Sequence, residues 1–260
     1  MKFEKLSNTR DLGGMITMDH NRIKSGKLVR SGHLHAASEA DKRILAETID
    51  QIVDFRTKQE KEEKPDPVIE GVAYCHLPIF ESLAAGVSRD QRSDEEAFAL
   101  VAKDPGRAKQ YMTDTYLGFV TSEYSISQYR RFLDILLKDH EKAVLWHCTA
   151  GKDRAGFATI IVLELLGVDR QTILGDYLKT NDHLKDEVSV LLTMLEARMG
   201  GLNDQKNAAL NYLFGAHEEY VNALYQSIDT RFGSFSGFAK TALAVSPSEI
   251  ETLRSLYLEH

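Results

Sequence analysis

The sequence predicts an α/β protein in which a mostly parallel sheet is flanked by helices. Short apolar segments, bounded by turn residues, alternate with longer segments of helical period in the first part of the chain. A strand–helix–strand order favours parallel pairing through a right-handed crossover. The last hundred residues or so are patterned as helices almost throughout, so the sheet is expected to lie in the first 150 residues.

The first expected elements are two strands and a helix. The segment 28–30 follows a Ser-Gly turn, and 51–55 has the apolar character of a buried strand. Between them, 38–49 begins with a Ser-x-x-Asp capping signal and continues at helical period, which predicts a helix. A further strand is expected within 72–80, ending near Pro78.

Residues 81–130 differ from their surroundings and are expected to form a helical insertion. They carry mixed charge and amphipathic runs at 95–101 and 108–120, separated by the turn-like segment 104–106 (Asp-Pro-Gly). Because no Gly/Ser-rich linker divides the chain, residues 1–260 are expected to form one domain that contains this insertion.

The remaining elements follow from the same patterns. A helix is expected at 130–138, a fully buried strand at 143–146, and a helix from about Arg154 to near Gly167. Later segments predict further helices, at 169–177, 185–199, 207–214 and 217–228.

Composition narrows the functional classes. With 43% hydrophobic and 27% charged residues, the chain of 260 residues is globular rather than disordered. The formal charge of −7 and the absence of a Lys/Arg block argue against nucleic acid as a partner. Two cysteines, Cys75 and Cys148, are too few for a disulfide framework and fit a reducing compartment.

Neither a signal peptide nor a membrane span is expected. The first fourteen residues lack the apolar core of a signal peptide. The longest apolar stretch, 158–168, contains Glu164 and is shorter than the ~20 residues that a spanning helix needs. A cytoplasmic location is therefore expected, with export by another route left open, and no pattern indicates an oligomeric state.

The segment 143–156 carries the chemistry. A buried strand ends at Cys148, a short loop follows, and Arg154 stands at the start of the next helix, five intervening residues later. Such a loop can turn its backbone N–H groups inward as an anion nest, which the planar guanidinium of Arg154 would close. A cysteine in that field is favoured as a thiolate, and it would lie beneath a bound phosphoryl group, ready for in-line attack.

The string His147-Cys148-x5-Arg154 resembles the signature of the protein tyrosine phosphatases. The fuller string HCTAGKDR is similar to the bacterial tyrosine/serine and lipid phosphatase branch of that family. Further segments match this branch in order, namely 8–14 (NTRDLGG), 30–32 (RSG), 53–56 (VDFR) with Glu60, 76–79 (HLPI), 231–235 (RFGSF) and 246–256. The resemblance covers nearly the whole chain. It implies a phosphatase fold, a phosphocysteine mechanism and no metal or organic cofactor.

The resemblance also implies site residues. Cys148 would be the nucleophile, and the phosphate would be held by Arg154 and the loop backbone, which comprises Thr149, Ala150, Gly151, Lys152 and Asp153. Two departures stand out: Ala155 occupies a position where conventional relatives carry a hydroxyl residue, and no Trp-Pro-Asp acid loop exists. The branch suggests Asp153 as general acid, with Asp90, Asp94 and Asp114 as rivals. The alternative for Asp153 is a helix N-cap alone.

Lys152 is open to two interpretations. Phosphoinositide phosphatases often carry a lysine in this loop, where it meets a second phosphate; alternatively, Lys152 is a solvated loop charge. The branch acts on phosphotyrosine, phosphoserine/threonine and phosphoinositides, so the expected partner is a phosphorylated protein or a phosphoinositide. In the same branch, helices near 81–130 form a lid over the pocket; the alternative is that this insertion thickens the core.

Supporting roles are expected for the neighbouring polar residues. His147 would orient the loop, and four others would brace it rather than touch substrate: Arg10, Asp11, Arg56 and Glu60. Cys75 is either a core residue or the partner of Cys148 in a reversible disulfide. His33 and His35 stand two apart without an evident third ligand, which argues against zinc.

Three functions from different classes compete. The first is an active cysteine-dependent phosphatase. The second is a catalytically silent module that binds phosphoproteins or phosphoinositides in the same nest, an alternative that Ala155 and the missing acid loop keep open. The third is a sulfur transferase or arsenate reductase, but arsenate reduction needs resolving cysteines and only Cys75 is available.

Overall fold

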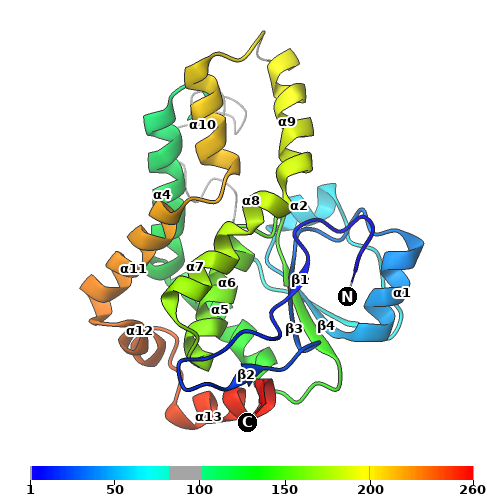
Figure 1. The fold of residues 1–260 in the computed structure, drawn as a ribbon, viewed down its shortest axis with the longest axis vertical. Helices are drawn as coiled ribbons and strands as arrows, with labels where there is room; N and C mark the ends of the chain where they lie inside the picture. Colours follow the sequence, from blue (N-terminus) through cyan, green and yellow to red (C-terminus); the bar gives the residue numbers. More distant parts are fainter. Residues whose placement is uncertain (1, 82–100, 199, 260) are drawn as a thin grey trace.

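A computed structural model describes residues 2–81, 101–198 and 200–259. Its centre is a five-stranded sheet in the order β1-β3-β6-β4-β5 (Figure 1). The strands are β1 (Arg10–Asp11), β3 (Leu28–Ser31), β6 (Ala143–His147), β4 (Ile49–Asp54) and β5 (Ala73–His76). Four of them run parallel and β1 is antiparallel at one edge, which confirms the mostly parallel sheet. A second pair, β2 (Arg22–Ile23) and β7 (Leu258–Glu259), is antiparallel.

The first strands form where the sequence predicts them, but β3 and β4 are not adjacent in the sheet. β3 and β4 are parallel, as the strand–helix–strand pattern predicts, but β6 lies between them and pairs with both. All five residues of β6 are buried, so this apolar strand occupies the centre of the sheet. β5 is shorter than expected, since it ends at His76.

Helices cover both faces of the sheet. Figure 1 shows α1 (Glu39–Thr48) on one side and α5, α6 and α7 on the other. Alternate residues of β6 accordingly face two cores: Leu145 packs with Leu45 of α1, and Trp146 packs with Phe132 and the other helices. The remaining helices are α2 (Lys58–Glu63), α4 (Pro105–Thr121), α5 (Glu123–Leu136), α6 (Arg154–Leu166), α7 (Arg170–Leu178), α8 (Thr180–His183), α9 (Lys185–Arg198), α10 (Asp204–Phe214), α11 (Glu218–Phe232), α12 (Phe235–Thr241) and α13 (Pro247–Tyr257).

Capping chemistry decides where several helices begin and end. Ser38 caps α1 in a reciprocal pair with Asp41, as the sequence predicts. The segment 104–106 is not a turn between helices: Asp104 caps α4 and Pro105 is its first residue, because proline is well accommodated where the N–H has no helical partner. α6 ends at Gly167, which adopts the left-handed conformation.

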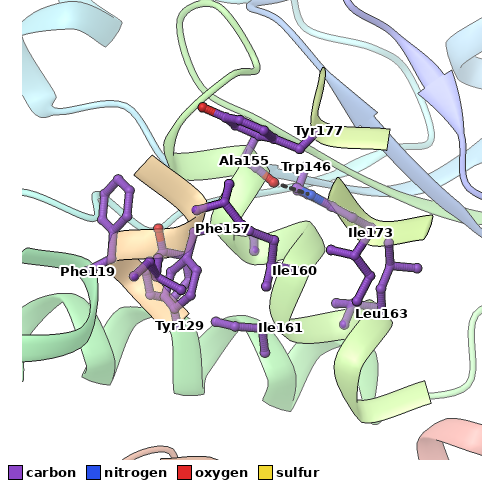
Figure 2. Close-up of a cluster of buried hydrophobic side chains, with 14 of the residues drawn as sticks. Phe119, Tyr129, Trp146, Ala155, Phe157, Ile160, Ile161, Leu163, Ile173 and Tyr177 are labelled. Atoms are coloured by element: carbon purple, nitrogen blue, oxygen red, sulfur yellow. Dashed lines mark hydrogen bonds between the residues drawn. The ribbon is translucent and has the colours of Figure 1, made fainter. Parts of the chain in front are cut away.

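The described part of the expected insertion contributes to the core. α4 buries Met112, Tyr116 and Phe119, and Phe119 stacks against Phe157 of α6, so this part thickens the core (Figure 2). Residues 82–100, which include the amphipathic run 95–101, lie outside the described residues. Among the residues that are described, no helix combines the length and apolar character needed to cross a bilayer.

Candidate active site

The candidate site is the loop that joins β6 to α6. Cys148 follows the last residue of β6 and its side chain is buried, with the residue only 2% exposed. The indole Nε1 of Trp146 donates to the Ala155 carbonyl (3.2 Å) and to Thr159 (3.1 Å), and Figure 2 shows the first of these hydrogen bonds. Strand and helix are therefore tied together on both sides of the loop, and the loop conformation is constrained at its two ends.

Three successive carbonyl groups of the loop are engaged by residues from outside it. The His33 backbone N–H donates to Thr149 O (2.9 Å), the Asn8 amide donates to Ala150 O (2.9 Å), and Arg30 Nη2 donates to Gly151 O (2.7 Å). Because each peptide unit is planar, a carbonyl held outward favours N–H groups that face inward. Within the described residues, none of the N–H groups from Thr149 to Asp153 donates to a protein acceptor. Free N–H groups of this kind are what an anion nest requires.

Gly151 is required for this shape. Its φ of +67° lies in the left-handed region, and a Cβ there would stand 2.4 Å from the Ser31 carbonyl oxygen. Both the conformation and the close approach exclude a side chain at this position.

Arg154 is aligned by Glu60 at the start of α2. The two guanidinium nitrogens contact the two carboxylate oxygens at 2.6 and 2.8 Å, and the Thr149 hydroxyl donates to the same carboxylate. Burial alone would raise the pKa of Glu60, but the hydrogen bonds and charge of Arg154 outweigh it and lower that pKa to about 2. Glu60 is thus an ionised brace, and it fixes the plane of the arginine fork.

Asp153 occupies the N-cap position of α6, yet its side chain makes no capping hydrogen bond. Its Oδ1 accepts from the Tyr116 hydroxyl (2.8 Å) and lies 3.6 Å from Lys152 Nζ, and the side chain is 25% exposed. The interpretation of Asp153 as a helix cap alone is therefore wrong.

Of the three rival acids, Asp114 lies within the described residues. Asp114 is exposed and accepts from Gln110 on the same helix. Asp90 and Asp94 lie outside the described residues. Of the described candidates, Asp153 is the one that belongs to the loop itself.

Lys152 is neither solvated nor directed into the nest. The residue is 2% exposed, and its ammonium donates to Leu213 O (2.7 Å) and Gly215 O (3.1 Å) at the end of α10. The interpretation as a solvated loop charge is wrong, since burial lowers the pKa of Lys152 and the ammonium has protein partners. In this geometry the side chain of Lys152 binds the end of α10, and its backbone alone is left to face the nest.

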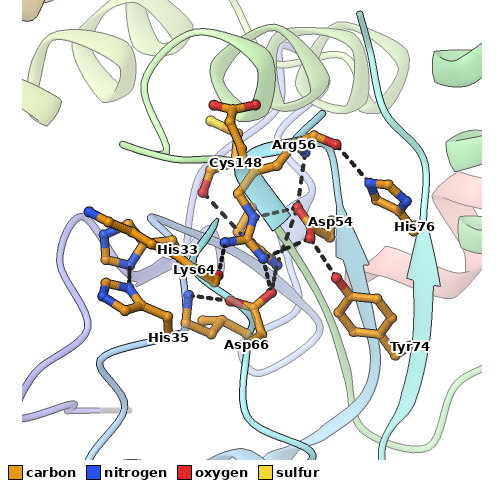
Figure 3. Close-up of polar contacts among 12 residues, drawn as sticks. His33, His35, Asp54, Arg56, Lys64, Asp66, Tyr74, His76 and Cys148 are labelled. Carbon is orange, nitrogen blue, oxygen red and sulfur yellow. Dashed lines mark hydrogen bonds and ion pairs between the residues drawn. The ribbon is translucent and has the colours of Figure 1, made fainter. Parts of the chain in front are cut away.

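A buried network lies beneath the loop (Figure 3). Arg56 binds Asp54 through two nitrogens (2.9 and 2.8 Å) and also contacts Asp66, and His147 Nε2 lies 3.1 Å from Asp66. Arg56 and His147, for which the sequence predicts supporting roles, make these contacts. Asp54, Asp66 and His147 have ligand atoms within 4.8 Å of one another, but Arg56 already supplies a cation to both carboxylates, so the set does not suit a metal ion.

A second network approaches from the other side. Asp176 on α7 binds Arg30 (2.7 Å) and Arg10 (2.8 Å), and Arg30 holds the Gly151 carbonyl. Arg10 therefore braces the loop indirectly, through Asp176 and Arg30, as expected. Asp11 instead accepts from Gly13 and Gly26 in the amino-terminal turn. Sequence reasoning assigned no role to Asp176. The apolar pattern of its helix identifies the element but not the ion pair.

Cys75 cannot be the disulfide partner of Cys148 in this fold. It pairs in register with Val53, which in turn pairs with Trp146, so it lies two strands away and two positions short of Cys148. At about 4.8 Å per strand, two strands already exceed the ~7 Å Cα separation that a disulfide tolerates. The core interpretation holds, since Cys75 packs against the main core.

The rings of His33 and His35 face each other, with their Nδ1 atoms 2.7 Å apart. Burial, followed by the neighbouring His35, lowers the pKa of His33 to about 4. A neutral pair needs no metal ion to hold it together.

A thiol at the base of an anion nest, facing an arginine fork that a buried carboxylate aligns, is suited to attack on a phosphoryl group. Fold and site together define a cysteine-dependent phosphatase. The chain belongs to the tyrosine phosphatase family, whose family model matches residues 1–259, and its enzymatic class is that of the protein-tyrosine phosphatases. The family that the sequence motifs indicate is confirmed.

Curated relatives span almost the whole chain. A protein of Cupriavidus necator that bears the name tyrosine-protein phosphatase is 31% identical over 99% of this chain and 88% of its own length. The triple specificity protein phosphatase PtpB of Mycobacterium tuberculosis is 29% identical over 96% of each chain. Among solved structures, a cysteine-to-serine variant of TpbA from P. aeruginosa in complex with phosphotyrosine aligns with 80% of this chain and 90% of that one, at 16% identity and a TM-score of 0.29.

Proposed function

We propose that Cys148 is the nucleophile of this phosphatase, that the loop backbone and Arg154 hold the phosphoryl group, and that Asp153 transfers the proton. The observation that carries the proposal is the outward engagement of three successive loop carbonyls, which leaves the N–H groups of the loop directed at the space above Cys148. Preorganised donors of this kind stabilise charge on equatorial phosphoryl oxygens without reorganising during the reaction.

In the first step, the Cys148 thiolate attacks phosphorus and the bond to the leaving oxygen breaks. The leaving oxygen takes the proton of the Asp153 carboxyl, so an alcohol or phenol departs and a thiophosphate ester remains. Arg154 supports the transferring group through its fixed fork, since Glu60 holds the guanidinium in one plane.

In the second step, water attacks the thiophosphate and gives its proton to Asp153. The sulfur–phosphorus bond breaks, inorganic phosphate forms and the Cys148 thiolate is regenerated. Ala155 offers no hydroxyl to this departing thiolate, so the nest and Arg154 carry the stabilisation alone. This supports a second step that is slow relative to the first.

The proposed substrates are phosphotyrosine first, and phosphoserine, phosphothreonine and phosphoinositides after it. A 2% exposed Cys148 favours a phosphate carried on a long, flat group such as a phenol ring. The name of the mycobacterial relative, triple specificity protein phosphatase, supports the wider range. A second phosphate could engage Lys152 only by displacing its ammonium from the α10 carbonyls, which places phosphoinositide bisphosphates lower in the order.

The test is phosphate release in the presence of EDTA from a phosphotyrosine peptide, a phosphoserine peptide and a set of phosphoinositides. Cys148→Ser is expected to abolish turnover while a phosphotyrosine peptide still binds. Cys75→Ser is the matched control, because it removes the other thiol, two strands away, and is expected to leave kcat/KM unchanged. When the wild-type enzyme is quenched with acid during turnover and then digested, phosphate should be found on the enzyme fragment that contains Cys148.

Turnover that survives in Cys148→Ser would refute the nucleophile assignment. Absence of turnover in the wild type, with the phosphopeptide still bound, would refute the catalytic proposal in favour of a binding module.

A further inference from the structure

The hydroxyl of Tyr116 reaches Asp153 from a different part of the chain. Tyr116 lies on α4, thirty-seven residues before Asp153, and its hydroxyl stands 2.8 Å from Asp153 Oδ1. The residue is fully buried, at 0% exposed. A buried hydroxyl that donates to a largely buried carboxylate of the loop is a specific contact, and a packing role does not require it.

The direction of the hydrogen bonds follows from their partners. An ionised carboxylate only accepts, so Tyr116 donates to Asp153. Its oxygen then accepts from the Tyr177 hydroxyl, 2.6 Å away, so the two hydroxyls form a chain of donors that ends on Asp153. Burial, and then the negative charge of Asp153, raise the pKa of Tyr116 well above its ordinary value. Tyr116 therefore stays a donor throughout the working pH range.

The ring of Tyr116 is fixed by its neighbours. Phe119 and Tyr220 lie with ring centroids 5.3 Å from it, and Tyr177 packs edge-on at 6.2 Å. A hydroxyl on so confined a ring can occupy only a small volume. The Tyr116 hydroxyl is therefore held in place by its ring, and it fixes the position of Asp153 Oδ1.

Two groups among the described residues approach the Asp153 carboxylate, and both lie nearest to the same oxygen. Tyr116 donates to Oδ1, and Lys152 Nζ lies 3.6 Å from Oδ1. As long as Tyr116 donates to Oδ1, the proton of a neutral Asp153 is favoured on Oδ2, because Oδ1 already faces a donor. After the proton has left, the same donor stabilises the negative charge that remains.

We propose that Tyr116 is the positioning residue for proton transfer, fixing the Asp153 proton on Oδ2, with Tyr177 as its support. The inference rests on the proposed role of Asp153 as general acid. In the first step the proton passes from Oδ2 to the leaving oxygen as the phosphorus–oxygen bond breaks. In the second step the attacking water returns a proton to Oδ2. Tyr116 keeps its own proton throughout.

The test compares leaving groups. The dinitrophenolate of 2,4-dinitrophenyl phosphate leaves without protonation, whereas the phenolate of phenyl phosphate needs an acid to protonate it. Tyr116→Phe removes one oxygen from a buried ring of the same shape, and it is expected to lower kcat/KM for phenyl phosphate by about 10-fold, a part of the 10²–10⁴ that general acid catalysis supplies. The dinitrophenyl ester should change by less than about 2-fold. Tyr177→Phe is expected to give a smaller selective loss, about 3-fold.

Tyr220→Phe is the matched control. It removes another buried hydroxyl, which donates to Tyr212 O (2.8 Å), from a ring that touches Tyr116 but lies outside the chain of donors. It should leave the ratio of the two substrates unchanged. Equal losses on both substrates in Tyr116→Phe, or the same selective loss in Tyr220→Phe, would overturn the inference. If Tyr116→Phe does not fold, as a thermal melt would show, the Tyr177→Phe ratio decides.

Asp153→Asn separates this inference from the proposed function. A selective loss of about 10²-fold or more on phenyl phosphate supports Asp153 as the acid. If Asp153→Asn is selective and Tyr116→Phe is not, the positioning role fails and the acid assignment stands. If neither variant is selective, the acid assignment fails, and the inference fails with it.

Discussion

The loop 148–154 and the helix α9 differ in what holds them. The loop is surrounded by buried charges, and three of its carbonyls are bound by residues from two other segments. Along α9, no described side chain is buried, and Val190 and Met194 are 55% and 64% exposed. α9 and α10 stand side by side (Figure 1), and side chains of both helices line a cavity of about 410 Å³.

This difference separates two ways of building structure. In the loop, geometry is fixed by polar partners that are costly to leave unpaired, so a single substitution there should affect the whole molecule. α9 depends on partly buried apolar side chains that tolerate change. Lys152 joins the loop to α10, the helix beside α9, because its ammonium binds carbonyls at the end of α10.

The largest effect is expected for Arg30→Met. This change leaves the Gly151 carbonyl without its donor and removes one of the two arginines that neutralise the buried Asp176. The free energy of unfolding should fall by about 3–5 kcal/mol. Urea denaturation measures this. A loss below about 1 kcal/mol would show that Arg10 alone satisfies Asp176, and the contrast between loop and helix would weaken.

Acid should weaken the loop region. The pKa of Glu60 falls from 4.5 to about 2 on folding. A lowered folded-state pKa means that the contribution is complete above about pH 4.5 and is lost as the pH falls toward 2, with about 3 kcal/mol at stake. Urea midpoints measured from pH 6 to pH 2 should therefore decline through this window. In Glu60→Gln the decline should be shallower; an identical decline in both proteins would contradict the assignment.

Lys152→Met tests the connection between the regions. The carbonyls of Leu213 and Gly215 lose their shared donor, at a cost of about 1–3 kcal/mol. Hydrogen exchange of the amides in α10 should accelerate while that of β6 stays the same. Faster exchange in β6 as well would mean that the two regions unfold as one unit.

The smallest effect is expected for the double change Val190→Ser and Met194→Ser. Both side chains are exposed, so the free energy of unfolding should change by no more than about 0.5 kcal/mol. The kcat/KM for a phosphotyrosine peptide should also be unchanged. A loss of several-fold in kcat/KM would show that this face of α9 contributes to substrate binding.

Local signals in the sequence were sufficient for the elements that position the site. The apolar run of β6 and the capping box of α1 depend on neighbouring residues, and both are confirmed. The Cys-x5-Arg spacing is equally local, and the family that it indicates is confirmed. The turn expected at 104–106 failed because the same three residues also suit a helix start, and only packing of α4 against the core decides between them.

The contacts that shape the site could not be predicted in this way. Nothing near Tyr116 indicates that its hydroxyl meets Asp153, and nothing near Lys152 indicates a carbonyl partner on α10. Helical spacing places Tyr116 on a buried face, but the partner of a buried polar group is set by tertiary packing. Motif order suggested that Arg10 and Glu60 brace the loop, without naming what they bind.

The hydrogen bonds around the loop join distant parts of the chain, and this has a consequence for synthesis. Asn8 and Ala150 are 142 residues apart, and Arg10 and Asp176 are 166 apart. At ribosomal rates of roughly 5–20 residues per second, Asp176 is synthesised on the order of 10 s after Arg10. A nascent chain released after α6 would contain every residue of the Cys-x5-Arg motif but not the Asp176 that orients Arg30. Catalytic competence should therefore arise late, only after α7 has left the ribosome.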